Sequence, residues 1–572
     1  MLTELRSLKL FRNSIFVVLG MLGMVLFGST AALGYGVSCP VLHPNPPSDA
    51  DKALRAAHYD QAAALFAAEV AAKPSDAEAV SGLVHALLRQ QKVKEAAEAV
   101  NSALGNAPTS VALVVLRGEV ELRGGILWDA AKSANEALKA DPCNPRARLL
   151  LARLEDISSL HASARAQILT AHKLDPEDQE IQEQWIWTLP SKQRIPEIEA
   201  YLASPTGDDP EDVRRLQMYL DFLKKQAEVP RKACHLVSET KSAEVPFAQL
   251  MADGAHVRSY GLDVKLNNHT ARLQIDTGAG GLLISRSVAE HAGLKALSRM
   301  EVGGIGDHGA KSGYTAYADS IRIGSLEFAD CAVQVLDSLN VMDDSDGLIG
   351  MDVFAQFLVT LDFPMRKLLL SPLPPRPGEV VSKAPVLKTG NSDAGEEGDE
   401  PASAGSGEKP ATPAESQPAK PASHGPFDRY IAPEMKDYTE VYRVGHNLIL
   451  PASLNEKALK LFIMDTGAWR TTISPQAARE VSKLHADDLK VKGISGEVDK
   501  VFTTDDITFR FAHLSQRAYG VYAFDTSHIS KNAGMEISGF IGANTLKMLT
   551  IHIDYRDGLV KFDYDPNRGY RN

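Results

Sequence analysis

The stretch Ile275-Asp276-Thr277-Gly278-Ala279 decides how the chain around it is expected to fold. It follows Gly261–Gln274, whose apolar pattern predicts two strands joined by a tight turn at Asn267-Asn268. The tetrapeptide recurs as Asp465-Thr466-Gly467-Ala468, again after an apolar run, Leu448–Met464. A lone Asp-Thr-Gly occurs by chance in many proteins, so the second copy gives the motif its weight.

The two copies also share the elements that follow them. Gly347-Leu348-Ile349-Gly350 comes after the first tetrapeptide and Gly539-Phe540-Ile541-Gly542 after the second. In both copies an aspartate, Asp362 or Asp554, stands twelve residues beyond the last glycine. Agreement in several separate features indicates an internal duplication.

With these motifs the chain resembles the retropepsin-like aspartic peptidases. In that family an apolar run, Asp-Thr-Gly-Ala and a later hydrophobic-hydrophobic-Gly element build one half of the active site. The resemblance implies two mainly-β, closed barrel-like domains of the acid protease type, at residues 245–373 and 428–566. Ala279 and Ala468 match the retropepsin side of the superfamily, since pepsin-like enzymes usually carry Ser there.

The resemblance implies that Asp276 and Asp465 are catalytic in an aspartic endopeptidase that needs no metal or cofactor. Two carboxylates about 3 Å apart cannot both ionise, so they share a proton, and one activates water while the other protonates the amide. The supporting residues are expected to be the rest of both tetrapeptides, with the threonine hydroxyls tying the two loops together, and the hydrophobic-Gly elements: Thr277, Gly278, Ala279, Thr466, Gly467, Ala468, Leu348, Ile349, Gly350, Phe540, Ile541 and Gly542.

Other functions fit the sequence less well. A catalytically inactive peptidase-like scaffold that binds protein would have no chemical need to keep both aspartates. A glycoside hydrolase does not place its two acids in duplicated Asp-Thr-Gly turns. Retropepsins assemble the aspartate pair from two chains, but the halves here differ after the motif, Gly280-Gly281 against Trp469-Arg470, which favours pairing within one chain.

Two glycine-containing loops are candidates for flaps that cover a substrate. They are Val302–Gly309 in the first half and Lys492–Gly496 in the second, and each is equally compatible with an ordinary hairpin loop. Trp469 fits a core position better than one that narrows the substrate site.

A regular repeat precedes the two halves. Pro74, Pro108, Pro142 and Pro176 recur every 34 residues, and Ala62, Ala96, Ala130 and Ala164 each stand twelve residues earlier. This period predicts stacked helix pairs and resembles the tetratricopeptide repeat family, over residues 47–230 with its capping helices. Such an array either binds a protein or peptide on its concave face or serves only as a spacer.

The N-terminus, residues 1–40, is predicted to be a signal or membrane anchor. Arg6, Lys9 and Arg12 precede the uncharged stretch Ser14–Leu33, which is about long enough to cross a bilayer. An uncleaved anchor is slightly favoured over cleavage near Ser29–Ala32. The basic flank then places the rest of the protein on the non-cytoplasmic side, the periplasm in a bacterium.

Four cysteines, Cys39, Cys143, Cys234 and Cys331, lie too far apart for a zinc finger or a disulfide-dense scaffold and leave the redox compartment open. Cys39 is interpreted as a free thiol, with lipidation as the less favoured alternative.

Composition limits the remaining choices. At 572 residues the chain should form several domains, and a net charge of -12 without a dense Lys/Arg block argues against nucleic acid as a partner. Residues 374–427, rich in Pro, Ala, Gly, Ser and Glu, are predicted to be a disordered linker. Its reach of roughly 40 Å would let the halves pair in either orientation.

Overall fold

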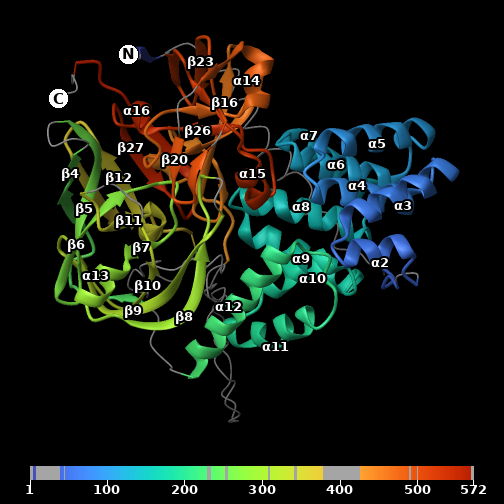
Figure 1. Ribbon diagram of the computed structural model, residues 1–572, viewed down its shortest axis with the longest axis horizontal. Helices are drawn as coiled ribbons and strands as arrows, with labels where there is room; N and C mark the ends of the chain where they lie inside the picture. Colours follow the sequence, from blue (N-terminus) through green and yellow to red (C-terminus); the bar gives the residue numbers. More distant parts are fainter. Residues whose placement is uncertain are drawn as a thin grey trace, which may run out of the picture.

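The computed structural model describes residues 4–7, 39–43, 46–228, 234–251, 256–306, 309–339, 344–377, 426–487, 491–498 and 500–567. Figure 1 shows a helical array, coloured blue to green, beside two mainly-β halves, one green to yellow and the other orange to red. The expected fold class, a helical repeat array followed by two mainly-β units, is confirmed.

The array follows the 34-residue period. α4, α6, α8 and α10 begin at Ala77, Val111, Pro145 and Gln179, and each period proline lies in the turn just before one of them. The helices are α2 (Asp49–Arg55), α3 (Tyr59–Ala72), α4 (Ala77–Arg89), α5 (Val93–Asn106), α6 (Val111–Arg123), α7 (Leu127–Ala140), α8 (Pro145–Ile157), α9 (His161–Leu174), α10 (Gln179–Trp187), α11 (Ser191–Leu202) and α12 (Pro210–Glu228).

Small residues allow these helices to approach closely. Ala62, Ala96 and Ala130 are fully buried. A Cβ atom on Gly118 of α6 would lie 2.5 Å from a methyl carbon of Leu150 in α8, so a larger residue at that position would push the helices apart. Helix starts are fixed by capping side chains, for example Asn144, whose Oδ1 accepts from the Ala147 amide.

The first β half contains a nine-stranded sheet in the order β2-β10-β7-β11-β6-β5-β9-β8, with β4 beside β5. The predicted hairpin at Asn267 is confirmed, because β5 and β6 pair antiparallel and Asn267 has a positive φ of 49°. The elements are β2 (His235–Leu236), β3 (Ala243–Pro246), β4 (Ala248–Met251), β5 (Val257–Leu266), β6 (His269–Ile275), β7 (Leu282–Ser285), α13 (Arg286–His291), β8 (Lys295–Val302), β9 (Lys311–Ile323), β10 (Leu326–Leu336), β11 (Gly347–Ile349), η1 (Met351–Phe354), β12 (Phe357–Asp362) and β13 (Lys367–Pro372).

The second β half repeats the plan in an eleven-stranded sheet, and its equivalent hairpin joins β16 to β17 through Asn455, also at a φ of 49°. Its elements are η2 (Pro433–Met435), β14 (Thr439–Glu440), β15 (Tyr442–Val444), β16 (Asn447–Leu454), β17 (Ala458–Met464), β18 (Thr472–Ile473), α14 (Pro475–Val481), β19 (Leu484–Asp487), β20 (Val491–Gly493), β21 (Gly496–Val498), β22 (Val501–Thr504), β23 (Ile507–Phe511), β24 (Leu514–Ala518), β25 (Tyr522–Ala523), α15 (Ser527–Ala533), β26 (Gly539–Ile541), α16 (Ala543–Leu546), β27 (Thr550–Asp554) and β28 (Leu559–Asp563).

The halves are not separate barrels joined by a linker alone, which corrects the expectation from sequence. They share a six-stranded sheet in the order β14-β28-β27-β12-β13-β3. Its central strands, β12 and β27, are the duplicated segments that end at Asp362 and Asp554, and they pair antiparallel across the junction. Thr360 Oγ1 and His552 Nδ1 are hydrogen-bonded at 2.9 Å between these strands.

The two described ends of the linker meet, so its expected long reach is not needed. Arg376, in the described first residues of the linker, places Nη2 2.6 Å from Asp557 Oδ1, and the amide of Tyr430, just after the linker, donates to the same oxygen at 2.8 Å. The guanidinium of Arg376 also stacks over Phe427 at 5.1 Å. Residues 378–425, which make up most of the stretch predicted to be disordered, lie outside the described part of the chain.

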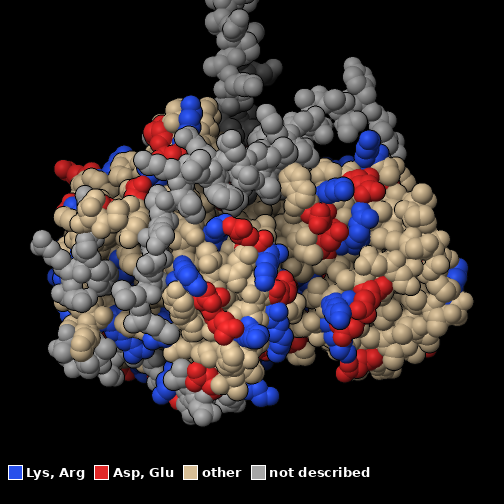
Figure 2. Space-filling view, turned by 90° about the horizontal axis from the view of Figure 1, so that it is seen from above, with Lys and Arg blue, Asp and Glu red and all other residues tan. Residues whose placement is uncertain are grey.

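The array packs against the second β half. Leu151 and Leu154 of α8 share one hydrophobic cluster with Leu461 and Met535. At the edge of this contact the Glu536 amide donates to the Arg123 carbonyl at 2.9 Å. On the face seen in Figure 2, basic and acidic residues alternate over the described surface instead of forming a field of one sign.

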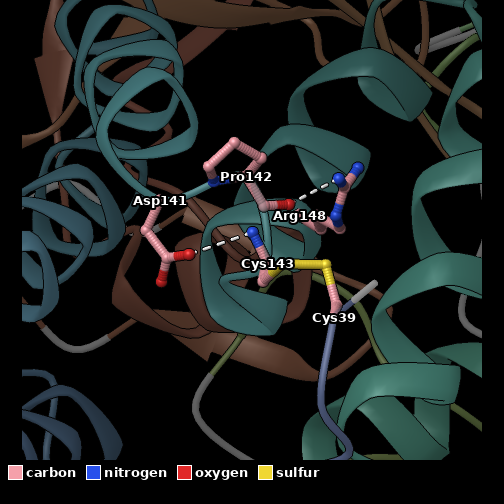
Figure 3. Close-up of a disulfide and its surroundings, with 5 residues drawn as sticks. All are labelled: Cys39, Asp141, Pro142, Cys143 and Arg148. Atoms are coloured by element: carbon pink, nitrogen blue, oxygen red, sulfur yellow. Dashed lines mark hydrogen bonds between the residues drawn. A yellow bond between two sulfur atoms is a disulfide. The ribbon is translucent and has the colours of Figure 1, made fainter. Parts of the chain in front are cut away.

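The cysteines form two disulfides, Cys39–Cys143 and Cys234–Cys331, so the interpretation of Cys39 as a free thiol or lipidated residue is wrong. Cys143 follows the period proline Pro142, and its amide donates to Asp141 Oδ1 at 3.0 Å (Figure 3). The first disulfide fastens the segment before the array to the α7–α8 turn, and the second joins β10 to the chain just before β2.

The predicted anchor, Ser14–Leu33, lies outside the described residues. Before it, the short strand β1 (Glu4–Ser7) pairs antiparallel with β24. Within the described part of the chain, every helix is too short or too polar to cross a membrane.

The contact between array and second half contains one buried carboxyl whose ionisation is disfavoured. Glu155 of α8 is 5% exposed, and its Oε2 atom has no hydrogen-bond partner among the described residues. Burial, followed by the charge of Asp428, raises the pKa of Glu155 from 4.5 to about 8. Because the folded protein keeps this carboxyl protonated, the group lowers the free energy of unfolding once the unfolded chain would ionise it. This loss of stability is absent below pH 4.5 and grows as the pH rises toward 8.

We predict that Glu155→Gln stabilises the protein near neutral pH by an amount on the order of 3 kcal/mol, because the amide avoids the cost of keeping a proton on the buried carboxyl. Thermal unfolding should show a midpoint raised by several degrees at pH 7.5 and almost unchanged at pH 4. Glu95→Gln, at an exposed position of α5, serves as the control. An equal change at both pH values would contradict the assignment.

Candidate active site

Both tetrapeptides form loops held from behind by the duplicated hydrophobic-Gly elements. The Asp276 amide donates to the Ile349 carbonyl of β11 at 3.0 Å, and the Asp465 amide donates to the Ile541 carbonyl of β26, also at 3.0 Å. β11 lies between β6 and β7, as β26 lies between β17 and β18. Leu348 and Phe540 are buried in these strands. These hydrogen bonds therefore fix the backbone of each aspartate at the end of the strand that precedes it.

Glycine is required where each element passes its loop. A Cβ on Gly350 would lie 2.3 Å from the Ala279 carbonyl oxygen, and one on Gly542 would lie 2.3 Å from the carbonyl carbon of Arg470. Contacts that close do not occur for real side chains, so any other residue would displace the active-site loops.

The two loops are tied together by reciprocal hydrogen bonds of the threonines. The Thr277 amide donates to Thr466 Oγ1 and the Thr466 amide donates to Thr277 Oγ1, both at 3.0 Å. Each hydroxyl in turn donates to a carbonyl of the opposite half: Thr277 to Met464 at 2.7 Å and Thr466 to Ile275 at 3.1 Å. All four bonds are buried, so they are protected from competition with water.

This tie brings Asp276 and Asp465 of one chain face to face, close enough for each carboxyl to affect the ionisation of the other. A Cβ on Gly278 would lie 2.7 Å from the Asp465 carboxyl carbon, and one on Gly467 would lie 2.4 Å from that of Asp276. Because each glycine faces the opposite carboxyl, a side chain at either position would occupy the space of the aspartate pair.

The surroundings favour one shared proton on the pair. Burial, followed by the charge of Asp465, raises the pKa of Asp276 well above its usual range. Burial also raises the pKa of Asp465, but the amides of Ala468 and Gly467, each 2.8 Å from its Oδ1, oppose that shift. Both carboxyls are thus disfavoured as charged groups, and they titrate as a pair that holds one proton.

The two candidate flap loops contact each other. The Gly304 amide donates to Ser495 Oγ at 3.0 Å, and the Ser495 amide donates to the Ile305 carbonyl at 3.0 Å. Val302 and Ile494 belong to the same hydrophobic cluster as Ala279, next to the aspartate loop. Both loops therefore lie beside the aspartate loops, as flaps would. In the first candidate flap, Asp307 and His308 lie outside the described residues.

Trp469 is 48% exposed, so its interpretation as a core residue is wrong. Its ring lies 5.0 Å from Lys547 Nζ, which also faces the ring of Tyr260 at 5.6 Å. Burial, followed by the charge of Arg258, lowers the pKa of Lys547 to about 8. Tyr260 and Arg258 come from the first half, so this cluster joins the halves on one side of the site.

Sequence reasoning missed three residues that hold the loops. His446 Nε2 lies 3.2 Å from the Gly278 carbonyl oxygen, and the His446 ring packs on Gly280. Asp352 Oδ1 accepts from the Gly281 amide at 3.0 Å, and Asn544 Oδ1 accepts from the Thr471 amide at 2.8 Å. The last two stand two residues after Gly350 and Gly542, so comparing the copies could have found them, whereas nothing in the sequence marks His446.

Among the described residues, no group of three or more His, Cys, Asp or Glu side chains is arranged to hold a metal ion. The described residues bring two carboxyls and the surrounding amide donors to the site.

Comparisons with known proteins agree with these features. A family model described as aspartyl protease matches residues 262–353, and a tetratricopeptide repeat model matches residues 50–111. DNA damage-inducible protein 1 of Neurospora crassa is 30% identical over 111 residues, which are 19% of this chain and 24% of that protein. The chain thus spans about a quarter of that relative's length.

Among solved structures, the aspartic proteinase from Irpex lacteus aligns with a TM-score of 0.32 and 12% identity, over 57% of this chain and 99% of that chain. By the family models, residues 262–353 form an aspartyl protease-like domain and residues 50–111 form tetratricopeptide repeats.

Proposed function

We propose that the protein is an aspartic endopeptidase that hydrolyses peptide bonds with water activated by Asp276 and Asp465. The observation that carries the proposal is the reciprocal threonine tie, which holds the two buried carboxyls against one another. In the resting pair Asp465 is the carboxylate and Asp276 carries the proton. Asp465 accepts a proton from water as the water attacks the substrate carbonyl, and Asp276 donates its proton to the carbonyl oxygen.

Collapse of the tetrahedral intermediate breaks the carbon–nitrogen bond. The leaving amine takes up a proton from Asp465, and a hydroxyl of the intermediate returns its proton to Asp276 as the carbonyl re-forms, so the pair again holds one proton. The low-dielectric surroundings that raise both pKa values also strengthen the charge interactions in this step.

The substrate class we propose is an extended polypeptide held beneath the paired flap loops. The hydrogen bond between Gly304 and Ser495 joins the two flap loops, so this bond has to break before a substrate can enter. The same closed contact is compatible with a second candidate, a scaffold without turnover that holds a peptide or partner. A peptidase assay on the purified chain separates the two.

We also propose that the protein works on the non-cytoplasmic side of a membrane, tethered or exported through its N-terminal segment, and in the periplasm if the source is bacterial. Its two disulfides support this, because cytosolic thiols are normally kept reduced. Each closes a long loop, with separations of 104 and 97 residues, for which chain entropy gives roughly 4–5 kcal/mol of stabilisation.

We expect Asp276→Asn and Asp465→Asn each to reduce kcat by roughly 10²–10⁴-fold or more, because Asn can neither hold the shared proton nor accept one. Folding should persist, since Asn has nearly the same shape as Asp and adds no charge to the buried pair. Turnover of a peptide library, with and without a transition-state inhibitor, measures the effect. Asp505→Asn, an exposed aspartate paired with His485, should retain activity, and near wild-type turnover in either dyad variant would refute the site.

Location can be tested by expressing the full chain in bacteria and adding protease to spheroplasts. We predict that the added protease digests the array and both β halves. We also predict that, without a reductant, none of the four cysteines is alkylated, because all four are in disulfides. Protection of the array while a periplasmic control is digested would show that the proposed location is wrong.

A further inference from the structure

The exposed ring of Trp469 belongs to the loop that carries one aspartate of the pair. Trp469 follows Ala468, whose amide donates to Asp465 Oδ1 at 2.8 Å. The Ala468 carbonyl accepts from the Ala543 amide at 2.8 Å, and the Trp469 carbonyl accepts from the Asn544 amide at 3.2 Å. These bonds fix the backbone, while 48% of Trp469 stays exposed. A peptide that lies across the two aspartates therefore passes this ring.

A buried ammonium group lies behind the ring. Lys547 Nζ is 5.0 Å from the centre of the Trp469 ring and 5.6 Å from that of Tyr260, and it donates to the Arg258 carbonyl. Only 6% of Lys547 is exposed. The two aromatic rings and the carbonyl stabilise the ammonium, but none of them carries a negative charge that would balance it.

A second positive charge acts on this ammonium. Burial, followed by the charge of the exposed residue Arg258, lowers the pKa of Lys547 to about 8. Among the described residues, neither Lys547 nor Arg258 forms an ion pair with a carboxylate. Two neighbouring cations repel each other, and a carboxylate beside them offsets that repulsion. This arrangement of charges favours a ligand that brings a carboxylate.

The opposite side of the aspartate pair is built differently. Arg258 and His446 each stand nine residues before the turn asparagine of their hairpins, so the duplication puts a basic residue at the same place in both halves. His446, however, packs on Gly280, which is the counterpart of Trp469 in the first half. One side thus has an exposed ring and two cations, and the other has an imidazole beside a glycine. The two sides therefore select different substrate residues.

We propose that Trp469, Lys547 and Arg258 form a subsite that selects an acidic side chain, Asp or Glu, in the substrate. The carboxylate contacts the exposed Arg258, and its methylene groups lie on the Trp469 ring. Lys547 adds a buried positive charge, which acts strongly because little water surrounds it. An extended peptide advances about 3.3 Å per residue, so the acidic residue lies within a few positions of the bond that is cut. Selection during cleavage rests on the proposed peptidase function, whereas selection in binding can be measured without turnover.

Binding is tested with the full chain carrying Asp276→Asn, which should hold peptides without cutting them. A library of random dodecapeptides is applied to the immobilised protein near pH 6, and the retained peptides are sequenced. We expect Asp and Glu to be enriched about tenfold over Asn and Gln at one position of the aligned sequences. The enrichment should disappear in Arg258→Gln and in Lys547→Met, because methionine removes the charge but still packs between the two rings.

The pH dependence separates a charge effect from a merely structural one. The groups that face the Lys547 ammonium are Arg258, Trp469 and Tyr260. Because Lys547 loses its proton as the pH rises through about 8, the enrichment should fall several-fold by pH 9.5. In Lys547→Arg it should persist at that pH, because arginine stays charged. Lys457→Met, at an exposed lysine of the β16–β17 turn, is the matched control and should change nothing.

Cleavage of the same library by the wild-type chain is the second arm. We expect its products to carry Asp or Glu at one fixed position relative to the cut. Cleavage without this preference, or enrichment that survives in both Arg258→Gln and Lys547→Met, would overturn the subsite and leave the proposed peptidase function standing. Enriched binding without cleavage would support the subsite and contradict that function. If the Asp276→Asn protein retains no peptide, the subsite is wrong.

Discussion

The reciprocal hydrogen bonds between Thr277 and Thr466 are the interaction on which the rest of the structure depends. They are made only when the two halves face each other in one register. In that register the two carboxyls meet, and Gly278 and Gly467 stand where any side chain would collide with the opposite aspartate. Two buried carboxyls in contact cannot both ionise, so the tie offsets the free-energy cost of keeping a proton on the pair.

The other contacts between the halves maintain this register from a distance. β12 and β27 pair at the centre of a shared sheet, and the cluster of Trp469, Lys547 and Tyr260 joins the halves beside the loops. Asp557 holds both described ends of the linker at one point, so the linker does not have to carry the pairing. The array adds a contact to each half, and through α12 it reaches the hairpin of the first flap.

Local motifs and periods could be read from the sequence. The 34-residue spacing predicted the helix starts, and the duplicated tetrapeptides with their hydrophobic-Gly elements predicted which loops would come together. The sequence could predict these features because they depend on backbone geometry that is repeated within the chain. The comparison of Gly350 with Gly542 could also have located Asp352 and Asn544.

Features that depend on long-range placement were missed. Cys39 pairs with Cys143 because the segment before the array runs back along the α7–α8 turn, and no spacing rule predicts that. The pairing of β12 with β27 across the two halves was not predicted, because it joins strands that lie far apart in the sequence. His446 acts through a contact with the remote Gly278, so its role depends on the three-dimensional arrangement.

The central claim is that one chain supplies both aspartates of a single site. Mixing purified Asp276→Asn with Asp465→Asn protein, after partial unfolding and refolding together to allow exchange, tests it most directly. The account predicts that the mixture is as inactive as either variant alone, because each chain pairs its own halves through the shared sheet. Recovery of about a quarter or more of wild-type turnover, roughly the share expected from random pairing between chains, would contradict it.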